Sequence, residues 1–146
     1  MKTLEIISCD KVDWEDLNCF LKRFYGKTKG KFLTEHGDWW YKSHRNSLAI
    51  VKGSDIACYC ALIPTCVSIR GIRKAALWWV DLVVAHRYRG MGLQSDIDRY
   101  LRESKELVLG FPNELAAMIH RKHGWGVRED GLVLMLPLIP DQIKSF

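Results

Sequence analysis

Residues 89–94, with the sequence RGMGLQ, are the part of the chain best suited to hold an anion. The two glycines let the backbone take positive φ and approach a ligand closely, and the unpaired N–H groups of a following helix would point outward. An anion placed there gains backbone hydrogen bonds and a helix-dipole contribution of roughly 0.3–1 kcal/mol. The segment therefore predicts an anion site, and the alternative is a tight turn that binds nothing.

Asp81 is the second candidate, because it places a carboxylate inside the apolar run of residues 78–84. That run is rich in β-branched and aromatic residues and is too short for an ordinary buried helix, so it predicts a largely buried strand. A carboxylate in such a strand is paired, hydrogen-bonded or functional. Two interpretations stay open: a general base, acting directly or through a water molecule, and a structural hydrogen bond to a neighbouring loop.

The elements that position these residues follow from periodicity. Apolar residues recur at helical spacing after the turn and predict an amphipathic helix ending near residue 104: Leu93, Ile97, Tyr100 and Leu101. Its acids, Asp96 and Asp98, come early and its bases come late, as the helix dipole favours. A short apolar run at residues 107–109 then predicts a strand parallel to the first, reached by a right-handed crossover.

The last quarter of the chain predicts one more helix and a hairpin. Asn113 is a good N-cap for a helix in which Leu115, Met118 and Ile119 face inward, and Gly124 provides the C-terminal stop. A hairpin at residues 129–131 then leads into an apolar strand at residues 132–138.

The first half of the chain predicts a strand at residues 4–8, two helical segments and a set of hairpins. Asp13 can cap the first helix, which Gly26 ends. The second segment covers residues 34–44, with Thr34 or Asp38 as its cap. Strands follow at residues 48–52, 56–69 and 78–84, and Pro64 makes the second of them bend, bulge or lie at an edge. The whole pattern predicts a single mixed-sheet α+β domain over residues 1–146.

Composition limits the class of protein. The chain has 146 residues, 48% apolar and 27% charged, which suits one globular domain. No apolar run approaches the ~18 residues of a membrane span, and the chain opens directly into a strand-like segment, so we expect a cytoplasmic protein with no membrane partner. Five cysteines lack the spacing of a metal site or a disulfide framework and are interpreted as buried free thiols: Cys9, Cys19, Cys58, Cys60 and Cys66.

The formal net charge of +5 indicates anionic partners without saying which. The basic segment of residues 22–31 is the place where a nucleic acid could bind. We favour a helix C-terminus followed by a solvated loop there, so a nucleic-acid partner is disfavoured.

Two motifs resemble those of the GNAT N-acetyltransferase superfamily, and the resemblance covers nearly the whole chain. Residues 82–92, LVVAHRYRGMG, are similar to that family's acyl-CoA signature R-x-x-G-x-G/A. Residues 113–125, NELAAMIHRKHGW, resemble the family's N-x-x-[AS]-x-x-x-Y-x-x-x-G-[FW]. Either motif is weak alone, but the pair occurs in the family's order and on the elements that the family places there.

The resemblance implies a GNAT-like domain, with an antiparallel meander, a parallel β-α-β unit and about four flanking helices. It also implies acetyl-CoA as the acyl donor. The backbone of the glycine turn would cradle the pyrophosphate: Arg89, Gly90, Met91, Gly92, Leu93 and Gln94. The main chain of Leu82, Val83 and Val84 would bond the pantetheine arm and polarise the thioester carbonyl. Asn113 would touch the pantetheine where the two parallel strands splay apart.

Two positions depart from the family pattern. Gln94 stands where the signature ends in Gly or Ala; a register that starts at Arg87 fits in full but suits the flanking elements less well. His120 stands where the family commonly has a tyrosine that reprotonates the departing thiolate. A thiol has a pKa of ~8.5 and an imidazole one of ~6.5, so an imidazolium could donate this proton. The alternatives for His120 are a polar residue near a helix end and a metal ligand beside His123, which lacks a third ligand.

The sequence therefore predicts an N-acetyltransferase that moves an acetyl group from acetyl-CoA to a primary amine by direct attack. His120 would be the acid, and Asp81 the base that an amine of pKa ~10.4 requires. No metal is expected. The acceptor, a small molecule or a peptide, and the formation of a homodimer stay open. The alternative functions are a catalytically silent acyl-CoA-binding module and, less favoured, a nucleic-acid-binding module.

Overall fold

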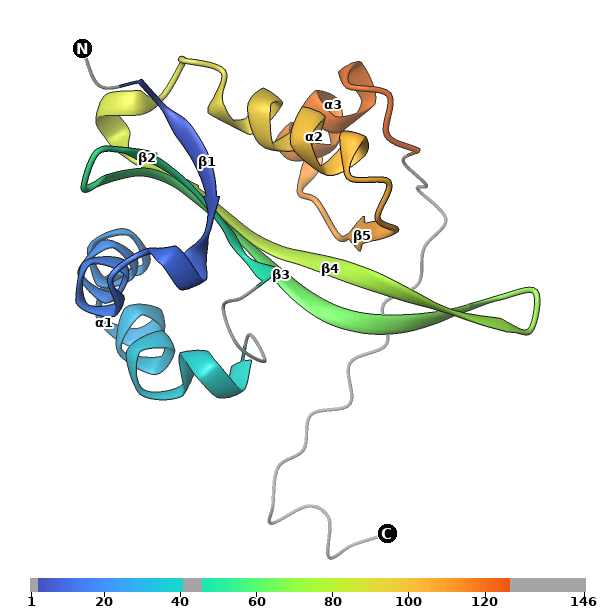
Figure 1. Cartoon of the computed structure of the whole chain (residues 1–146), viewed down its shortest axis with the longest axis horizontal. Coiled ribbons are helices and arrows are strands. Elements are labelled where there is room, and N and C mark those ends of the chain that lie inside the picture. The colour runs from blue at the N-terminus through green and yellow to red at the C-terminus, as the bar shows by residue number, and fades with distance from the viewer. Residues whose placement is uncertain (1–2, 41–45, 127–146) are drawn as a thin grey trace, which may run out of the picture.

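The computed structural model describes residues 3–40 and 46–126, which form a five-stranded sheet with helices on both faces (Figure 1). The strands, in their order across the sheet, are β1 (Glu5–Ser8), β2 (Leu48–Lys52), β3 (Asp55–Ile69), β4 (Ile72–Val84) and β5 (Val108–Gly110). The helices are α1 (Trp14–Trp40), α2 (Leu93–Glu103) and α3 (Glu114–Lys122), with short 3₁₀ turns at Cys9–Lys11 and His86–Tyr88. The predicted α+β class is confirmed.

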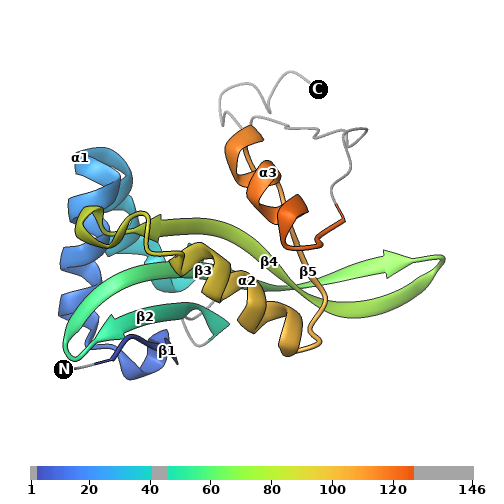
Figure 2. The same cartoon turned by 90° about the horizontal axis from the view of Figure 1, so that it is seen from above.

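Strands β1 to β4 pair antiparallel and β5 pairs parallel with β4, so the predicted meander and β-α-β unit are both present. β2 pairs with β3 only as far as Cys60, and Pro64 therefore lies where β4 is the one described neighbour of β3. This confirms an edge position for Pro64, which lacks the N–H of an inner strand. Arg70 and Gly71 turn the β3–β4 hairpin with φ of 52° and 81°, as a type I′ turn requires. The hairpin extends beyond the rest of the molecule (Figure 2).

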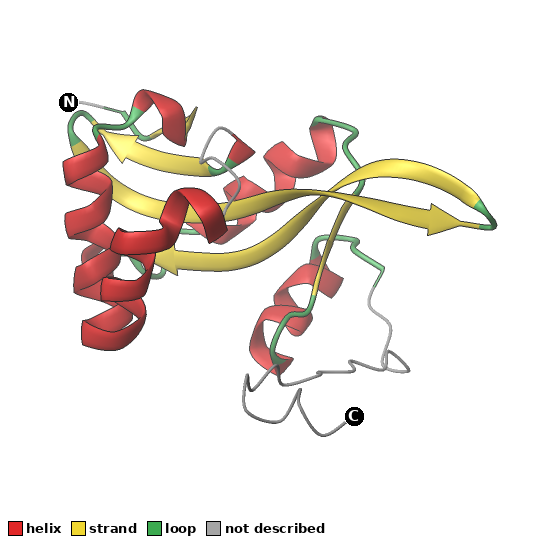
Figure 3. Cartoon of the chain, turned by 90° about the horizontal axis from the view of Figure 1, so that it is seen from below, coloured by secondary structure: helices red, strands yellow, loops and turns green. Residues whose placement is uncertain are grey.

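Strand β4 is bulged and then parts from β5. The register between β3 and β4 shifts so that Val80 is an extra residue in β4. β5 pairs with β4 over three positions that end at Trp79 and Gly110. Beyond Trp79, β4 runs on to Val84 with no strand partner on that side in the described part of the chain. The two parallel strands therefore separate, as the resemblance implies, and Figure 3 shows β5 leaving the sheet at a steep angle.

Helix α1 consists of two halves that meet at Gly26, where φ is 70° and the backbone is not helical. The predicted stop at Gly26 is confirmed. Asp13 caps the start of the helix as predicted, because its Oδ1 accepts the backbone N–H of Glu15 at 2.8 Å. The solvated loop predicted after Gly26 is wrong, since the chain returns at once to helix.

The second half of α1 folds back against the first. A Cβ at Gly30 would lie 2.8 Å from the Cα of Lys22, so the close approach of the two halves requires a glycine there. The caps predicted at Thr34 or Asp38 are wrong, because both residues lie inside the helix. The hydroxyl of Thr34 donates instead to the carbonyl of Gly30 at 2.9 Å. The two helical halves are thus joined at Gly26, whose positive φ reverses the chain without the loop that the sequence predicted.

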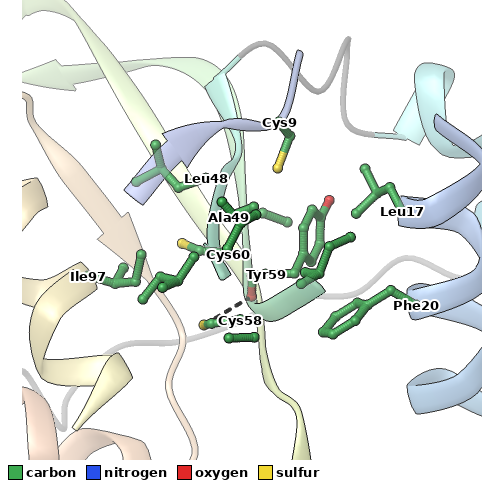
Figure 4. Packing of buried hydrophobic residues seen from close by; sticks show 14 of the residues in the cluster. Cys9, Leu17, Phe20, Leu48, Ala49, Cys58, Tyr59, Cys60 and Ile97 are labelled. Atoms are coloured by element: carbon green, nitrogen blue, oxygen red, sulfur yellow. Dashed lines mark hydrogen bonds between the residues drawn. The ribbon is translucent and has the colours of Figure 1, made fainter. Parts of the chain in front are cut away.

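The core lies on both sides of the middle strands (Figure 4). Tyr59 of β3 is buried on the side of Leu17 and Phe20, which come from α1. Its neighbour Cys60 is buried on the opposite side, toward Ile97 of α2. Successive residues of β3 therefore serve two different helix layers, as the alternation of a strand dictates.

The cysteines divide between this core and the surface. Cys9, Cys58 and Cys60 are buried free thiols, as predicted, and burial raises the pKa of Cys9 and of Cys58 to about 12. The prediction is wrong for Cys19 and Cys66, which are exposed. Cys19 takes an outward position of α1, and Cys66 lies in the hairpin beyond the edge of β2.

The apolar face of α2 is confirmed only in part. Its buried apolar residues are Leu93, Ile97 and Leu101. Tyr100 is 43% exposed, so its predicted place in the apolar stripe is wrong. Asp98, in contrast, is fully buried. The sequence analysis had interpreted it only as an acid near the start of the helix that interacts favourably with the helix dipole.

The inward face predicted for α3 is largely wrong. Leu115 and Met118 are exposed in the described part of the chain, whereas Ala117 is buried and Ile119 is half-buried. The buried face of this helix is set by a small residue and by His120, three positions further on.

Two further expectations concern the end of the chain and membranes. The hairpin predicted at residues 129–131 and the strand at residues 132–138 lie outside the described residues. No helix in residues 3–40 and 46–126 is long and apolar enough to cross a membrane.

Candidate active site

The turn between β4 and α2 is anchored before it reaches its glycines. Tyr88 donates its hydroxyl to Asp55 Oδ2 at 2.6 Å, and Arg87 forms an ion pair with the other oxygen of that carboxylate. The hydrogen bond to Asp55 raises the pKa of Tyr88. Asp55 is the first residue of β3, so the β2–β3 turn holds the end of β4 and the start of the glycine turn together.

The glycine turn itself is open. Gly90 and Gly92 have φ of 77° and 80°, and a Cβ on either would meet nothing within 4 Å. Gly92 is the N-cap of α2 and carries no side chain to cap the helix. The N–H groups of the first turn are therefore left for a ligand, because the orphan donors of a helix start need a partner from outside. This geometry fits a pyrophosphate, the group expected at Arg89, Gly90, Met91, Gly92, Leu93 and Gln94.

Two of those residues have further features. The guanidinium of Arg89 folds back so that its Nε donates to the carbonyl of Val84 at 3.3 Å. The side-chain Nε2 of Gln94 is buried without a hydrogen-bond partner in the described residues. A glycine or alanine at position 94 would leave no such group, so this departure from the family pattern places an extra amide donor beside the turn.

The unpaired stretch of β4 follows the bulge. Leu82 and Val83 pair with β3 on one side and have no described strand on the other. Two carbonyls that flank them already accept side-chain donors: that of Val84 from Arg89, and that of Asp81 from the indole Nε1 of Trp79 at 3.2 Å. The main chain of Leu82 and Val83 is thus the part of this edge without a described side-chain donor.

Gly110 and Asn113 lie on the opposite side of the split, the place beyond Trp79 and Gly110 where β4 and β5 separate. Asn113 caps α3 as predicted, because its Oδ1 accepts the N–H of Ala116 at 2.9 Å. A Cβ at Gly110 would lie 2.7 Å from the carbonyl oxygen of Trp79, so β5 can approach β4 only with glycine there. The role predicted for Asn113 toward pantetheine stays a prediction.

His120 lies where the split begins. Its ring stands edge-on to Trp79, the last β4 residue that pairs with β5, with centroids 4.9 Å apart. Trp125 contacts it from another direction at 5.9 Å. A Schellman motif fixes this end of α3: the N–H of Trp125 bonds to the carbonyl of His120, and Gly124 takes φ of 77°. The predicted C-terminal stop is therefore confirmed.

Asp98 is a site residue that the sequence analysis missed. Its side chain is fully buried, and its Oδ1 lies 2.9 Å from Nδ1 of His120. Burial raises the pKa of this carboxyl, and the charge and hydrogen bond of His120 act in the opposite direction. The signal was available, because Asp98 shares a helix face with Ile97 and Leu101, at i, i+1 and i+4.

Asp81 lies on the other face of the sheet. Its Oδ1 accepts Nζ of Lys29 in α1 at 2.6 Å, and the two side chains are 12% and 46% exposed. The ammonium of Lys29 also stands 4.1 Å from the ring centroid of Tyr25. The carboxylate thus makes a structural hydrogen bond, which was one of the two interpretations of Asp81. Its partner lies in a helix and not in the loop that this interpretation expected. No contact joins Asp81 to His120 in the described residues.

His123, at the end of α3, has a different partner from His120. His123 Nε2 lies 2.9 Å from Ser95 Oγ, in the first turns of α2. No group of three His, Cys, Asp or Glu side chains in residues 3–40 and 46–126 is arranged as metal ligands would be.

No sequence-family model and no curated protein sequence matches the chain. Its fold matches solved structures over nearly its whole length. An integron cassette protein from the mobile metagenome of V. cholerae superposes with a TM-score of 0.71 at 13% identity, covering 99% of this chain and 98% of that one. An acetyltransferase of Trypanosoma brucei superposes with a TM-score of 0.60 at 21% identity, covering 92% and 99%. The chain has an acetyltransferase fold.

A third structure with this fold is an aminoglycoside N-acetyltransferase in complex with CoA. It superposes with a TM-score of 0.62 at 9% identity, covering 92% of this chain and 93% of that one. At such identities the likeness concerns the fold. The GNAT-like fold that the two motifs predicted is confirmed.

Proposed function

We propose that the chain is an N-acetyltransferase that takes an acetyl group from acetyl-CoA and transfers it to a primary amine. The observation that carries the proposal is the open glycine turn, where the space above Gly90 and Gly92 is free and no side chain caps α2. Beyond β5, the strand that leads into the turn has no partner on one side among the described strands, and an extended ligand could lie there. The fold neighbour in complex with CoA supports the same donor.

Residues of this chain would bind the donor in three places. The backbone of residues 89–94 would hold the pyrophosphate through the N–H groups of residues 90 and 92–94, because those of Arg89 and Met91 already bond to the carbonyls of His86 and Tyr88. The anion would also gain the dipole of α2. The pantetheine arm would lie along Leu82 and Val83 like an added strand. Asn113 would face it across the split; because its Oδ1 caps α3, its amide NH₂ is the group that could donate. When bound, acetyl-CoA supplies the activated acyl carbon.

In this proposal the transfer needs two proton movements. The free amine would attack the thioester carbon, the C–S bond would break, and its electron pair would go to sulfur. His120 would donate a proton to the thiolate, and the proton that the amine loses would pass to Asp81 or through water. The amide product and the CoA thiol then balance the reaction.

A second function is favoured by one observation. Lys29 already holds Asp81 Oδ1 at 2.6 Å, and a carboxylate oxygen bonded to an ammonium group is not free to take a proton. A module that binds acyl-CoA without turnover would need no base. Binding and turnover must therefore be measured separately.

The binding test is isothermal calorimetry with acetyl-CoA and CoA on the wild type and on Gly92→Trp. The indole would fill the open space above the turn, so we expect micromolar binding to the wild type and none to the variant. Gly71→Trp is the matched control, because Gly71 also has a φ near 80° with nothing within 4 Å, but at the far hairpin tip. Equal binding to all three proteins, or to none, contradicts the proposed cofactor site.

The turnover test is release of free CoA thiol with a panel of primary amines. Wild-type release that depends on the amine, and that His120→Phe and Asp81→Asn lower, supports the transferase. Binding of acetyl-CoA without release for any amine supports the silent module.

A further inference from the structure

The buried carboxylate of Asp98 packs against His120, the proposed acid. Asp98 belongs to α2 and His120 to α3, and their contact is the 2.9 Å approach of Oδ1 to Nδ1. The side chain of Asp98 is fully buried and that of His120 is 14% exposed. The second nitrogen of His120, Nε2, makes no hydrogen bond with any described residue.

The pair sits in an aromatic enclosure. Trp79 and Trp125 each stand edge-on to the imidazole, and their own ring centroids are 6.1 Å apart. The carboxylate's other oxygen, Oδ2, and the indole Nε1 of Trp125 are both buried without a hydrogen bond in the described residues. His120 is therefore the hydrogen-bonding partner that fixes Asp98, and Asp98 is the one that fixes His120.

Few other titratable groups face the pair. Burial raises the pKa of Asp98, and the charges of His120 and then of His123, at the end of α3, act in the opposite direction. Cys60 comes from β3 on the other side, and its thiol is fully buried with a pKa raised well above its usual value. Neither group hydrogen-bonds to the imidazole.

We propose that Asp98 is a positioning residue that holds His120 with its proton on Nδ1, so that the proton exchanged with the substrate is carried by Nε2. An ionised carboxylate only accepts hydrogen bonds, and the nitrogen that faces it must therefore carry a hydrogen. In the neutral ring, Nε2 then holds a lone pair; in the charged ring, it is the donor. The Asp98–His120 contact thus decides which nitrogen serves the reaction.

The catalytic meaning of this pair rests on the proposed function. As the C–S bond breaks, the thiolate sulfur would take the Nε2 proton of the charged ring, which leaves neutral His120 still bonded through Nδ1–H to Asp98. Proton uptake at Nε2 from water then restores the charged ring. Without the carboxylate, the neutral ring could place its one remaining hydrogen on either nitrogen, so Nε2 would no longer be set as the atom that exchanges the proton.

The tautomer can be read without substrate. Protein labelled with ¹⁵N-histidine would be studied by long-range ¹H–¹⁵N correlation over a pH series, with the signals of His120 assigned by their loss in His120→Gln. We expect the neutral ring to show a protonated Nδ1 and an unprotonated Nε2 in the wild type. In Asp98→Asn the amide can donate or accept, so we expect a mixture of tautomers. Asp96→Asn is the matched control, because Asp96 lies in the same helix, is 38% exposed and pairs with Arg99 rather than with His120. It should keep the wild-type pattern.

A wild-type His120 whose neutral form carries its hydrogen on Nε2 overturns the proposal, whether or not Asp98→Asn folds. An unchanged tautomer in folded Asp98→Asn overturns it equally. Both outcomes are independent of acyl transfer, so the proposed function can fail while the tautomer is as expected.

Kinetics test the catalytic consequence. If the wild type acetylates an amine, Asp98→Asn should lower kcat by about tenfold or more, a part of the ~10²–10⁴-fold that general acid catalysis supplies. KM for acetyl-CoA should stay unchanged, because the side chain of Asp98 hydrogen-bonds to His120 and not to the backbone of the glycine turn. A variant that raises KM and leaves kcat intact would contradict the positioning role.

Discussion

Two carboxylate pairs, one on each face of the sheet, differ in how deeply they are buried. Asp81 bonds to Lys29 of α1, and the lysine side chain is 46% exposed. Asp98 bonds to His120, and its own side chain is fully buried. Water can replace Lys29 but cannot reach Asp98, so the second pair has to be compensated inside the protein. Loss of one partner should therefore matter little on the first face and greatly on the second.

The largest expected effect comes from removing His120. His120→Ala leaves the carboxyl of Asp98 buried without a hydrogen bond, and we expect the free energy of unfolding to fall by about 3 kcal/mol. This is the lower end for a broken buried pair, because Asp98 can take up a proton when its partner is lost. Urea denaturation near neutral pH, followed by circular dichroism, gives the value.

His123→Ala is the control for this comparison. His123 lies at the same end of α3, is half-buried, and hydrogen-bonds to Ser95 rather than to a buried carboxylate. We expect a loss of about 1 kcal/mol, as for an ordinary hydrogen bond. Equal losses in the two variants would mean that the Asp98–His120 pair has no special place in stability.

The pH dependence of stability gives the second test. Burial raises the pKa of Asp98 in the folded protein, with His120 offsetting a part. A carboxyl with a raised folded pKa stabilises fully below its unfolded pKa of ~3.9, and that contribution is lost as pH rises through the folded value. Asparagine cannot ionise. We therefore expect the unfolding free energy of the wild type, relative to Asp98→Asn, to fall as pH rises from about 4 toward neutral.

Urea denaturation of both proteins at several pH values gives this difference. Groups remote from Asp98 cancel, whereas His120 contributes to the difference because it is paired with Asp98. Asp96→Asn removes a half-buried carboxylate that pairs with Arg99 of the same helix, and it corrects for the change in net charge. A wild type that gains on Asp98→Asn with rising pH would reverse the sign and show that the paired, ionised carboxylate stabilises the fold.

Features that depend on a few neighbouring residues could be predicted from the sequence, whereas contacts between distant residues could not. Most signals that act over a few residues were correct: the caps at Asp13 and Asn113, the stops at Gly26 and Gly124, and the edge position of Pro64. The caps predicted at Thr34 or Asp38 were the exception, because the helix continues through both residues. Each correct signal depends on backbone geometry that one residue type imposes locally. The glycine turn belongs to the same class, since its positive φ values are a property of Gly90 and Gly92 themselves.

The pairs that give the site its chemistry were not predictable in this way. Asp98 and His120 are 22 residues apart, and Lys29 and Asp81 are 52 apart. Their contacts exist only once α2 packs against α3 and α1 folds back at Gly26. The sequence analysis interpreted Asp98 as an acid that interacts favourably with the helix dipole, and it predicted that Lys29 lies in a solvated loop. Both interpretations missed the pairs, because a local pattern carries no information on which distant side chain will be adjacent.

The smallest expected effect concerns the pair on the other face. A double-mutant cycle of Lys29→Met and Asp81→Asn should give a coupling energy of about 1 kcal/mol or less, because the lysine is half exposed. Methionine keeps most of the apolar stem beside Tyr25, so the cycle isolates the charge. A coupling of ~3 kcal/mol or more would mean that this pair behaves like a buried one and would erase the contrast between the two faces. The same variants separate stability from catalysis: if Asp81 takes the amine proton, Asp81→Asn loses turnover, while Lys29→Met, which removes the ammonium group from Asp81 Oδ1, keeps or raises it.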